Sequence, residues 1–343
     1  MKSHREGFPA GVYLVMALLT LTAAVLCVCA GSVAVPVGET LRAVWRALRG
    51  LPAGTGSAAR IILPVRLPRV LCVALEGAAL SLCGGAMQGL LRNPLADGST
   101  LGVSAGASLG AALSIAFGLT LPGLASFGTT GMAMLFAFLS MLLVLALAYR
   151  LDYSLSTNTI ILIGVIFSMF VSSLLSLAIT FAGEKVRTIT FWTLGSLSGS
   201  SYGDALTLLA ALLLFGTPLL LKSRELNAFA VSEDNARSVG IDVRRVKLLV
   251  LVCVSALIGV CVSVGGTIGF VGLVMPHMLR LLAGPNHRRL LPACLFGGAS
   301  FLMLCDLLAR TVLAPRELPI GVVTSLIGAA AFVLIFARTR KGA

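Results

Sequence analysis

Long apolar runs dominate the chain, and short polar segments separate them. The runs are continuous over about 20 residues, whereas strands of a membrane barrel would alternate over about 10. Backbone amides find no water partners in lipid, so continuous apolar runs of this length indicate helices. Ten membrane-spanning helices are therefore predicted, at about 11–34, 68–90, 100–118, 126–149, 158–182, 204–221, 247–266, 270–284, 290–308 and 318–337.

The composition agrees with this pattern. Apolar residues make up 58% of the 343 residues and charged residues 11%, whereas an ordinary soluble domain is about 25% charged. The expected fold class is an all-α polytopic membrane protein with one transmembrane domain over 1–343. The first apolar run is too long for the core of a signal peptide and is kept as a span. The eight cysteines lie within apolar runs, where we expect small buried hydrophobes and no metal site.

The basic residues fall between the spans and report on orientation. With the N-terminus inside, 16 of the 26 lysines and arginines lie on the inner side, which predicts that both termini are cytoplasmic. Six of the other ten crowd into 35–69, around an extracytoplasmic loop at about 35–67. The net charge of +13 forms no continuous basic domain with interleaved aromatic residues, so nucleic acid is not expected as a partner.

Four polar or glycine-rich stretches carry most of the remaining information. In the stretch at 226–247, Ser232 precedes two acidic residues and Gly240 follows shortly after, which predicts a short cytoplasmic helix. No GxxxxGK[ST] loop occurs in the chain, so an ATPase driving this protein would be a separate chain. The stretches are LLRNPLADGSTLGVSAGASLGAAL (90–113), LNAFAVSEDNARSVGIDVRRVK (226–247), GGTIGFVGLVMPHMLRLLAGPNHRRLLP (265–292) and DLLARTVLAPRELPIG (306–321).

Together with RLPR (66–69) and FWTLGSLSG (191–199), and in this order, these stretches resemble the FecCD-type permeases. Those proteins are membrane subunits of type II ABC importers for iron–siderophores, haem and cobalamin. The resemblance implies a bacterial inner-membrane homodimer, or a pair with a related permease. It also implies two cytoplasmic ATPase subunits that hold ATP and Mg, and an extracytoplasmic substrate-binding protein. This chain would be a transport subunit without enzymatic activity or a cofactor, and ferric siderophore is the expected cargo, with haem or cobalamin as alternatives.

The resemblance also implies roles for individual residues near the membrane surfaces. By this resemblance, Arg66, Arg69 and Arg310 are expected to dock the binding protein. Arginine suits this role because its planar guanidinium group pairs with carboxylates. Anchoring in lipid headgroups is the alternative for the first two. The polar loop at about 222–247, which we call the coupling loop, is expected to contact the ATPase. The residues expected to make this contact are Ser232, Glu233, Ala236, Arg237 and Gly240. The alternative for this loop is a solvated charged segment.

Further residues concern the path of the cargo. The cytoplasmic gate of the family matches Asn93, Leu95, Thr157 and Asn158, and a polar stripe on the fifth span comprises Ser168, Ser172 and Ser176. Serines also form hydrogen bonds within their own helix and allow close packing between helices, so a purely structural role for these three serines is the alternative.

Several charged residues remain without a firm role. Glu76 lies about two turns inside the second span, where a carboxylate is a candidate functional site. Arg60 has no assigned role. The spacing of three other arginines puts them on one face of a short interfacial helix beside Trp45, where contact with lipid is expected; they are Arg42, Arg46 and Arg49.

Two other functions were considered. An ion-coupled secondary transporter would need several buried carboxylates, and only Glu76 and Asp306 qualify. A membrane-embedded enzyme is disfavoured because the three histidines are scattered and no HExxH or nucleophile motif occurs.

Overall fold

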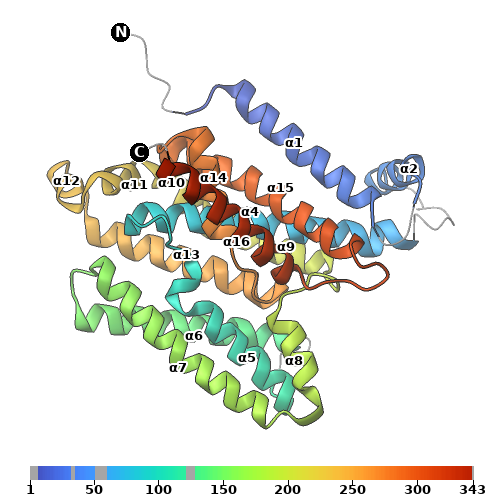
Figure 1. Cartoon of the computed structure of the whole chain (residues 1–343), viewed down its shortest axis with the longest axis horizontal. Helices are drawn as coiled ribbons and strands as arrows, with labels where there is room; N and C mark the ends of the chain where they lie inside the picture. Colours follow the sequence, from blue (N-terminus) through green and yellow to red (C-terminus); the bar gives the residue numbers. More distant parts are fainter. Residues whose placement is uncertain (1–6, 32–34, 51–59, 121–127, 342–343) are drawn as a thin grey trace.

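A computed structural model describes residues 7–31, 35–50, 60–120 and 128–341, and throughout these ranges the chain forms helices joined by turns (Figure 1). Residues 51–59 of the predicted outer loop lie outside the described residues. The elements are α1 Ala10–Cys29, α2 Val37–Leu48, η1 Ile62–Arg66, α4 Leu67–Leu91, η2 Gly98–Leu101, α5 Val103–Phe117, α6 Gly128–Leu151, α7 Thr157–Thr180, η4 Gly183–Lys185, α8 Val186–Thr193, α9 Tyr202–Ala211, η5 Leu212–Gly216, α10 Thr217–Leu221, α11 Ser223–Val231, α12 Glu233–Ser238, α13 Val243–Gly265, α14 Val271–Ala283, α15 His287–Thr311 and α16 Ile320–Lys341.

Each of the ten predicted spans contains a helix, which confirms the all-α membrane fold. Seven helical stretches in the described residues are long and apolar enough to cross a bilayer, and α5, α14 and α16 are shorter apolar helices. The first span ends at Cys29, earlier than predicted. The second begins with the wide turn η1 and runs into α4, while α9, η5 and α10 form one span.

The short helix expected after Ser232 is also present, as α12. The Ser232 hydroxyl accepts a hydrogen bond from the backbone N–H of Asn235 at 2.9 Å, and Gly240 follows the helix with φ +84°. The helix α11, which precedes it, was not anticipated.

The spans run roughly parallel to the long axis of the molecule. In Figure 1, α11, α12 and the two ends of the chain lie toward one end, and α2 lies at the opposite end. An even number of spans accounts for this arrangement. Following the predicted orientation, we call the end that carries α12 the coupling end and the end that carries α2 and α8 the outer end.

Helix α4 is the centre of the bundle. Of its 25 residues, 21 are buried, and it packs against α15, α14, α13 and α9. Glycines allow this close approach, because a Cβ on Gly77 would overlap the carbonyl oxygen of Gly298 in α15, and one on Gly84 would overlap that of Gly272 in α14. Small residues are the usual means of bringing helices together in membranes.

The helices α5, α6 and α7 form a second group on one side of α13 (Figure 1). The outward face of α7 is apolar over much of its length, with Ile166 57% and Phe170 61% exposed. Between α6 and α7 lies an apolar groove of about 400 Å³ lined by leucines, isoleucines and phenylalanines. Such a face suits lipid or another membrane helix.

Replacing Gly84 by alanine should destabilise the fold. Alanine favours a helix over glycine, so a loss can come only from the overlap with Gly272. We expect a cost of about 1–3 kcal/mol, as for other overpacked interiors, measured as a lower thermal midpoint in detergent. The matched control is Gly11→Ala in α1, where an added Cβ meets nothing within 4 Å. Equal midpoints for the two variants would contradict the close α4–α14 contact.

Candidate functional site: an outer ion cluster and an inner coupling cavity

The predicted docking arginines lie at the outer end and are buried. Arg66, Arg69 and Arg310 are 5%, 6% and 3% exposed. Arg69 donates to Oδ1 of Asp306 through Nε at 3.0 Å and Nη2 at 2.8 Å, and its Nη1 donates to Oε2 of Glu317 at 2.8 Å. The Nε of Arg310 lies 3.0 Å from Oδ2 of Asp306, four residues earlier in α15. We call these five residues the outer ion cluster.

The two other arginines of the cluster bind the C-terminus of α1. The last carbonyls of a helix lack partners within the helix and attract cations. Nη1 of Arg66 donates to the carbonyls of Val28 at 3.2 Å and Cys29 at 2.9 Å. Nη2 of Arg310 donates to the carbonyl of Cys27 at 3.0 Å. The outer ion cluster thus joins α1, α4 and α15.

Docking of a binding protein by these three arginines stays a prediction. In this arrangement each guanidinium donates to partners inside the chain, so pairing with an external carboxylate would require an exchange of partners. Exposed arginines at the outer end lie elsewhere: on and near α2, in α8, and between α15 and α16. They are Arg42, Arg46, Arg49, Arg60, Arg187 and Arg316.

The predicted interfacial helix is present as α2. Trp45 is 56% exposed, and the guanidinium of Arg49 lies 4.5 Å from the centre of its ring. The charged and aromatic face expected from the spacing is therefore formed.

A second outer feature is a cavity of about 390 Å³ beside α8. Aromatic rings, hydroxyls and one carboxylate line it, from Thr188, Phe191, Trp192, Ser196, Ser198, Glu317, Leu318 and Pro319. The sequence reasoning noted the motif FWTLGSLSG but assigned no residue of it to a site. An uncommon run of aromatic and hydroxyl residues between two spans was the available signal.

At the coupling end, the structure brings together two groups of predicted residues. A polar cavity of about 340 Å³ is lined by the gate residues Thr157 and Asn158 and by the coupling residues Ser232, Glu233 and Arg237. The other gate residues, Asn93 and Leu95, are not among its lining; Arg92, next to them, is. We call this space the coupling cavity.

A buried lysine connects the two walls of the coupling cavity. Lys247 in α13 is fully buried, and its Nζ lies 2.8 Å from Oε1 of Glu233 in α12. The same Nζ donates to the carbonyl of Leu155 at 2.8 Å. Leu155 precedes α7 and has φ +51°, a conformation uncommon outside glycine. The coupling helix α12 is thus linked through one ammonium group to the segment that starts α7.

That segment is itself well ordered by Asp152. Its carboxylate accepts from the backbone N–H of Ser154 at 2.9 Å and of Ser156 at 3.0 Å, and from the Thr159 hydroxyl at 3.1 Å. Hydrogen bonds from the side chains of Ser154 and Ser156 lower the pKa of Asp152 below its usual range. A displacement of this turn is therefore expected to carry the N-terminus of α7 with it.

Not every predicted coupling residue faces outward. Ala236 is buried, whereas Asp234 and Arg237 expose 92% and 57% of their side chains. Val239 is 64% exposed. An ATPase docking on α12 would meet these exposed groups, with Ala236 packed behind them.

The predicted serine stripe and Glu76 differ in exposure. Ser172 and Ser176 are exposed on α7, while Ser168 is half-buried and donates to the carbonyl of Gly164 at 2.7 Å. Ser176 donates to the carbonyl of Ser172 at 3.0 Å, so bonding within the helix accounts for part of the stripe. Glu76 is fully buried.

The Glu76 carboxylate packs against Gly265 at the end of α13, and neither oxygen has a hydrogen-bond partner among the described residues. It lies in the helix packing and not on an open surface. A contact between Glu76 and cargo stays a hypothesis.

These features define an all-helical membrane protein that spans the bilayer many times, with a short polar helix, α12, at one end. Residues 18–338 match the FecCD transport family, and the protein belongs to that family. It is therefore the permease subunit of an ABC importer, not itself the catalytic chain, and it works with an ATPase and a binding protein. This assignment rejects the ion-coupled secondary transporter.

Relatives and a solved structure agree. The chain is 41% identical over 322 residues to an uncharacterized ABC transporter permease of Bacillus subtilis, covering 93% of this chain and 91% of that one. It is 38% identical over 328 residues to the vitamin B12 import permease of Klebsiella pneumoniae, covering 95% and 93%. It is 42% identical over 283 residues to a probable iron chelatin permease of Helicobacter pylori, covering 82% and 83%.

The fold resembles an inward-facing metal-chelate-type ABC transporter, with a TM-score of 0.83 at 32% identity, over 96% of this chain and all of that one. The recognition made from the ordered motifs is thus confirmed.

Replacing Asp306 by asparagine should destabilise the protein strongly. The change leaves Arg69 and Arg310 buried with less compensating charge, and breaking such a buried pair costs about 3–5 kcal/mol. A lower thermal midpoint in detergent is the expected result, with Asp234→Asn as the exposed control. An unchanged midpoint would show that the outer ion cluster does not hold the fold together.

Proposed function

We propose that this chain is one of the two permease subunits of an ATP-driven importer that carries a metal chelate into the cytoplasm, with the coupling end inside. The observation that carries the proposal is the Glu233–Lys247–Leu155 link, which connects the segment expected to meet the ATPase with the start of α7. The excess of basic residues at the coupling end supports the orientation.

The link supports alternating access for a physical reason. Lys247 is fully buried and the Glu233 side chain is 21% exposed, and removing one partner from such a pair leaves the other charge uncompensated. Since Lys247 bonds α12 and the Leu155 carbonyl at once, a shift of α12 is transmitted to α7 at little cost. The exposed serines of α7 then belong to the path shared with the second subunit.

The cargo class rests on the relatives. Their names record vitamin B12 in one group and an iron chelate in another, and both are large polar molecules with an enclosed metal. We propose a ferric siderophore as the cargo of this chain, with cobalamin as the competing candidate. An aromatic and hydroxyl-lined cavity at the outer end suits entry of either.

Transport in proteoliposomes tests this function. The permease, reconstituted with its ATPase and binding protein, should take up labelled ferric siderophore only with ATP, and vanadate should abolish the uptake. The binding protein should bind the same chelate and discriminate against cobalamin. If the binding protein preferred cobalamin, the proposed cargo would be wrong but the proposed import function would stand. Uptake that a proton gradient drives without ATP would overturn the proposed function.

Replacing Lys247 by methionine should uncouple the importer. Methionine keeps much of the length and apolar stem but removes both bonds of the ammonium group. We expect the ratio of cargo transported to ATP hydrolysed to fall about tenfold, equivalent to about 1.4 kcal/mol of lost coupling, while the ATPase still co-purifies. Lys247→Arg should retain part of the ratio.

The matched control for this test is Arg150→Gln, which removes an exposed arginine from the last turn of α6, outside the predicted coupling loop. It should leave the transport ratio unchanged. A proportional loss of transport and ATPase activity in Lys247→Met would indicate a purely structural role and contradict coupling through Lys247.

A further inference from the structure

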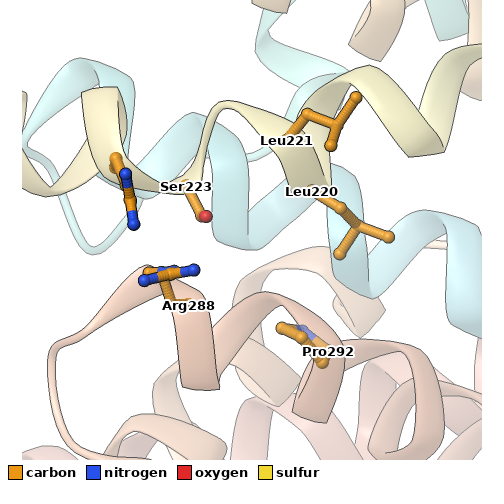
Figure 2. Close-up of a pocket in the computed structure, with 6 residues that line it drawn as sticks. Leu220, Leu221, Ser223, Arg288 and Pro292 are labelled. Carbon is orange, nitrogen blue, oxygen red and sulfur yellow. The ribbon is translucent and has the colours of Figure 1, made fainter. Parts of the chain in front are cut away.

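A small cavity at the coupling end is separate from the coupling cavity, although two of its residues, Ser223 and Arg224, begin the predicted coupling loop. It has a volume of about 270 Å³ and is formed where α10 meets α11, opposite the first turns of α15. Figure 2 shows Ser223 and Arg288 on facing sides of it, with Leu220, Leu221 and Pro292 forming the adjoining wall. Arg224 also lines it.

Among the described residues that line this cavity, two are arginines and none is a carboxylate. Arg224 and Arg288 share the same small space, so an anion between them would reduce the repulsion of their like charges. The nearby carboxylate of Glu225 is paired with Lys222 at 2.6 Å. Both arginines also have an interaction within the chain, but a guanidinium has five N–H donors and can keep one partner while binding another.

The cavity is amphipathic as well as basic. Leu221 is 73% exposed at the end of a membrane span, and Leu220 and Pro292 continue the apolar wall. The Ser223 side of the cavity carries a hydroxyl, and that residue is 7% exposed. Arginines and a hydroxyl at the polar end, with an apolar wall that opens toward the hydrocarbon, match a phosphate headgroup and the start of its acyl chain.

We propose that this cavity binds the phosphate of an anionic phospholipid, with Arg224 and Arg288 as its ligands. The bidentate geometry of arginine suits a phosphodiester. A bound lipid would connect α11, which leads into α12, to α15. The assignment to the cytoplasmic leaflet rests on the orientation in the proposed function, whereas the binding itself does not.

Thermal unfolding of the full-length protein in detergent, titrated with phosphatidylglycerol, tests the site. Ligand that binds only the folded protein raises the midpoint. We expect phosphatidylglycerol to raise it and phosphatidylcholine to have no comparable effect. In the double variant Arg224→Gln, Arg288→Gln, the lipid concentration needed for half of the shift should rise at least tenfold.

Controls separate binding from general stability and charge. Arg150→Gln removes an exposed arginine from the last turn of α6 and should keep the full response. If the double variant does not fold, the single variant Arg288→Lys should bind more weakly than the unaltered protein and more tightly than Arg288→Gln. Equal responses of the unaltered protein and the Arg288→Gln variant would overturn the site.

Inorganic phosphate distinguishes the two sources of the same chemistry. If phosphate alone reproduced the shift and phosphatidylglycerol added nothing, the site would bind a free anion and the lipid proposal would be wrong. Because these measurements need no ATPase, cargo or membrane orientation, their failure would leave the proposed import function untouched, and a failure of import would not affect them.

Discussion

The close contact of α4 with α14 and α15 is the constraint on which the rest of the structure depends. In a bilayer the lipid is as apolar as the side chains, so helices associate through close packing and polar contacts. Gly77 and Gly84 bring the backbones within reach. The approach of α15 to α4 then determines the outer end, where Arg69 meets Asp306. It also determines the coupling end, where the first turn of α15 lies against Gly89 of α4.

Charge is used differently at the two ends of the molecule. At the outer end, three arginines are buried with Asp306, and two of these arginines bond the last carbonyls of α1. At the coupling end, the buried ammonium of Lys247 bridges α12 and the turn before α7. Burial makes both arrangements sensitive to the loss of a partner.

Membership of the FecCD family agrees with the absence of a nucleotide-binding loop from the sequence. A permease without a nucleotide-binding loop must receive mechanical work from another protein. The exposed residues of α12 are polar, with Asp234 and Arg237 exposing 92% and 57% of their side chains, while Glu233 is paired with Lys247. The basic cavity between α11 and α15 lies beside this same segment, so lipid, ATPase and gate would act on one small region.

The sequence alone determined the ten spans, the interfacial helix and the short helix after Ser232, because apolar run length and helix capping are local properties. The ordered motifs also identified the family. Tertiary structure decided which charged groups are buried. The carbonyls that bind Arg66 belong to α1, far away in the chain, and Lys247 meets Leu155 across 92 positions. Such contacts depend on how helices pack, and no local pattern records the partner that a side chain meets after folding.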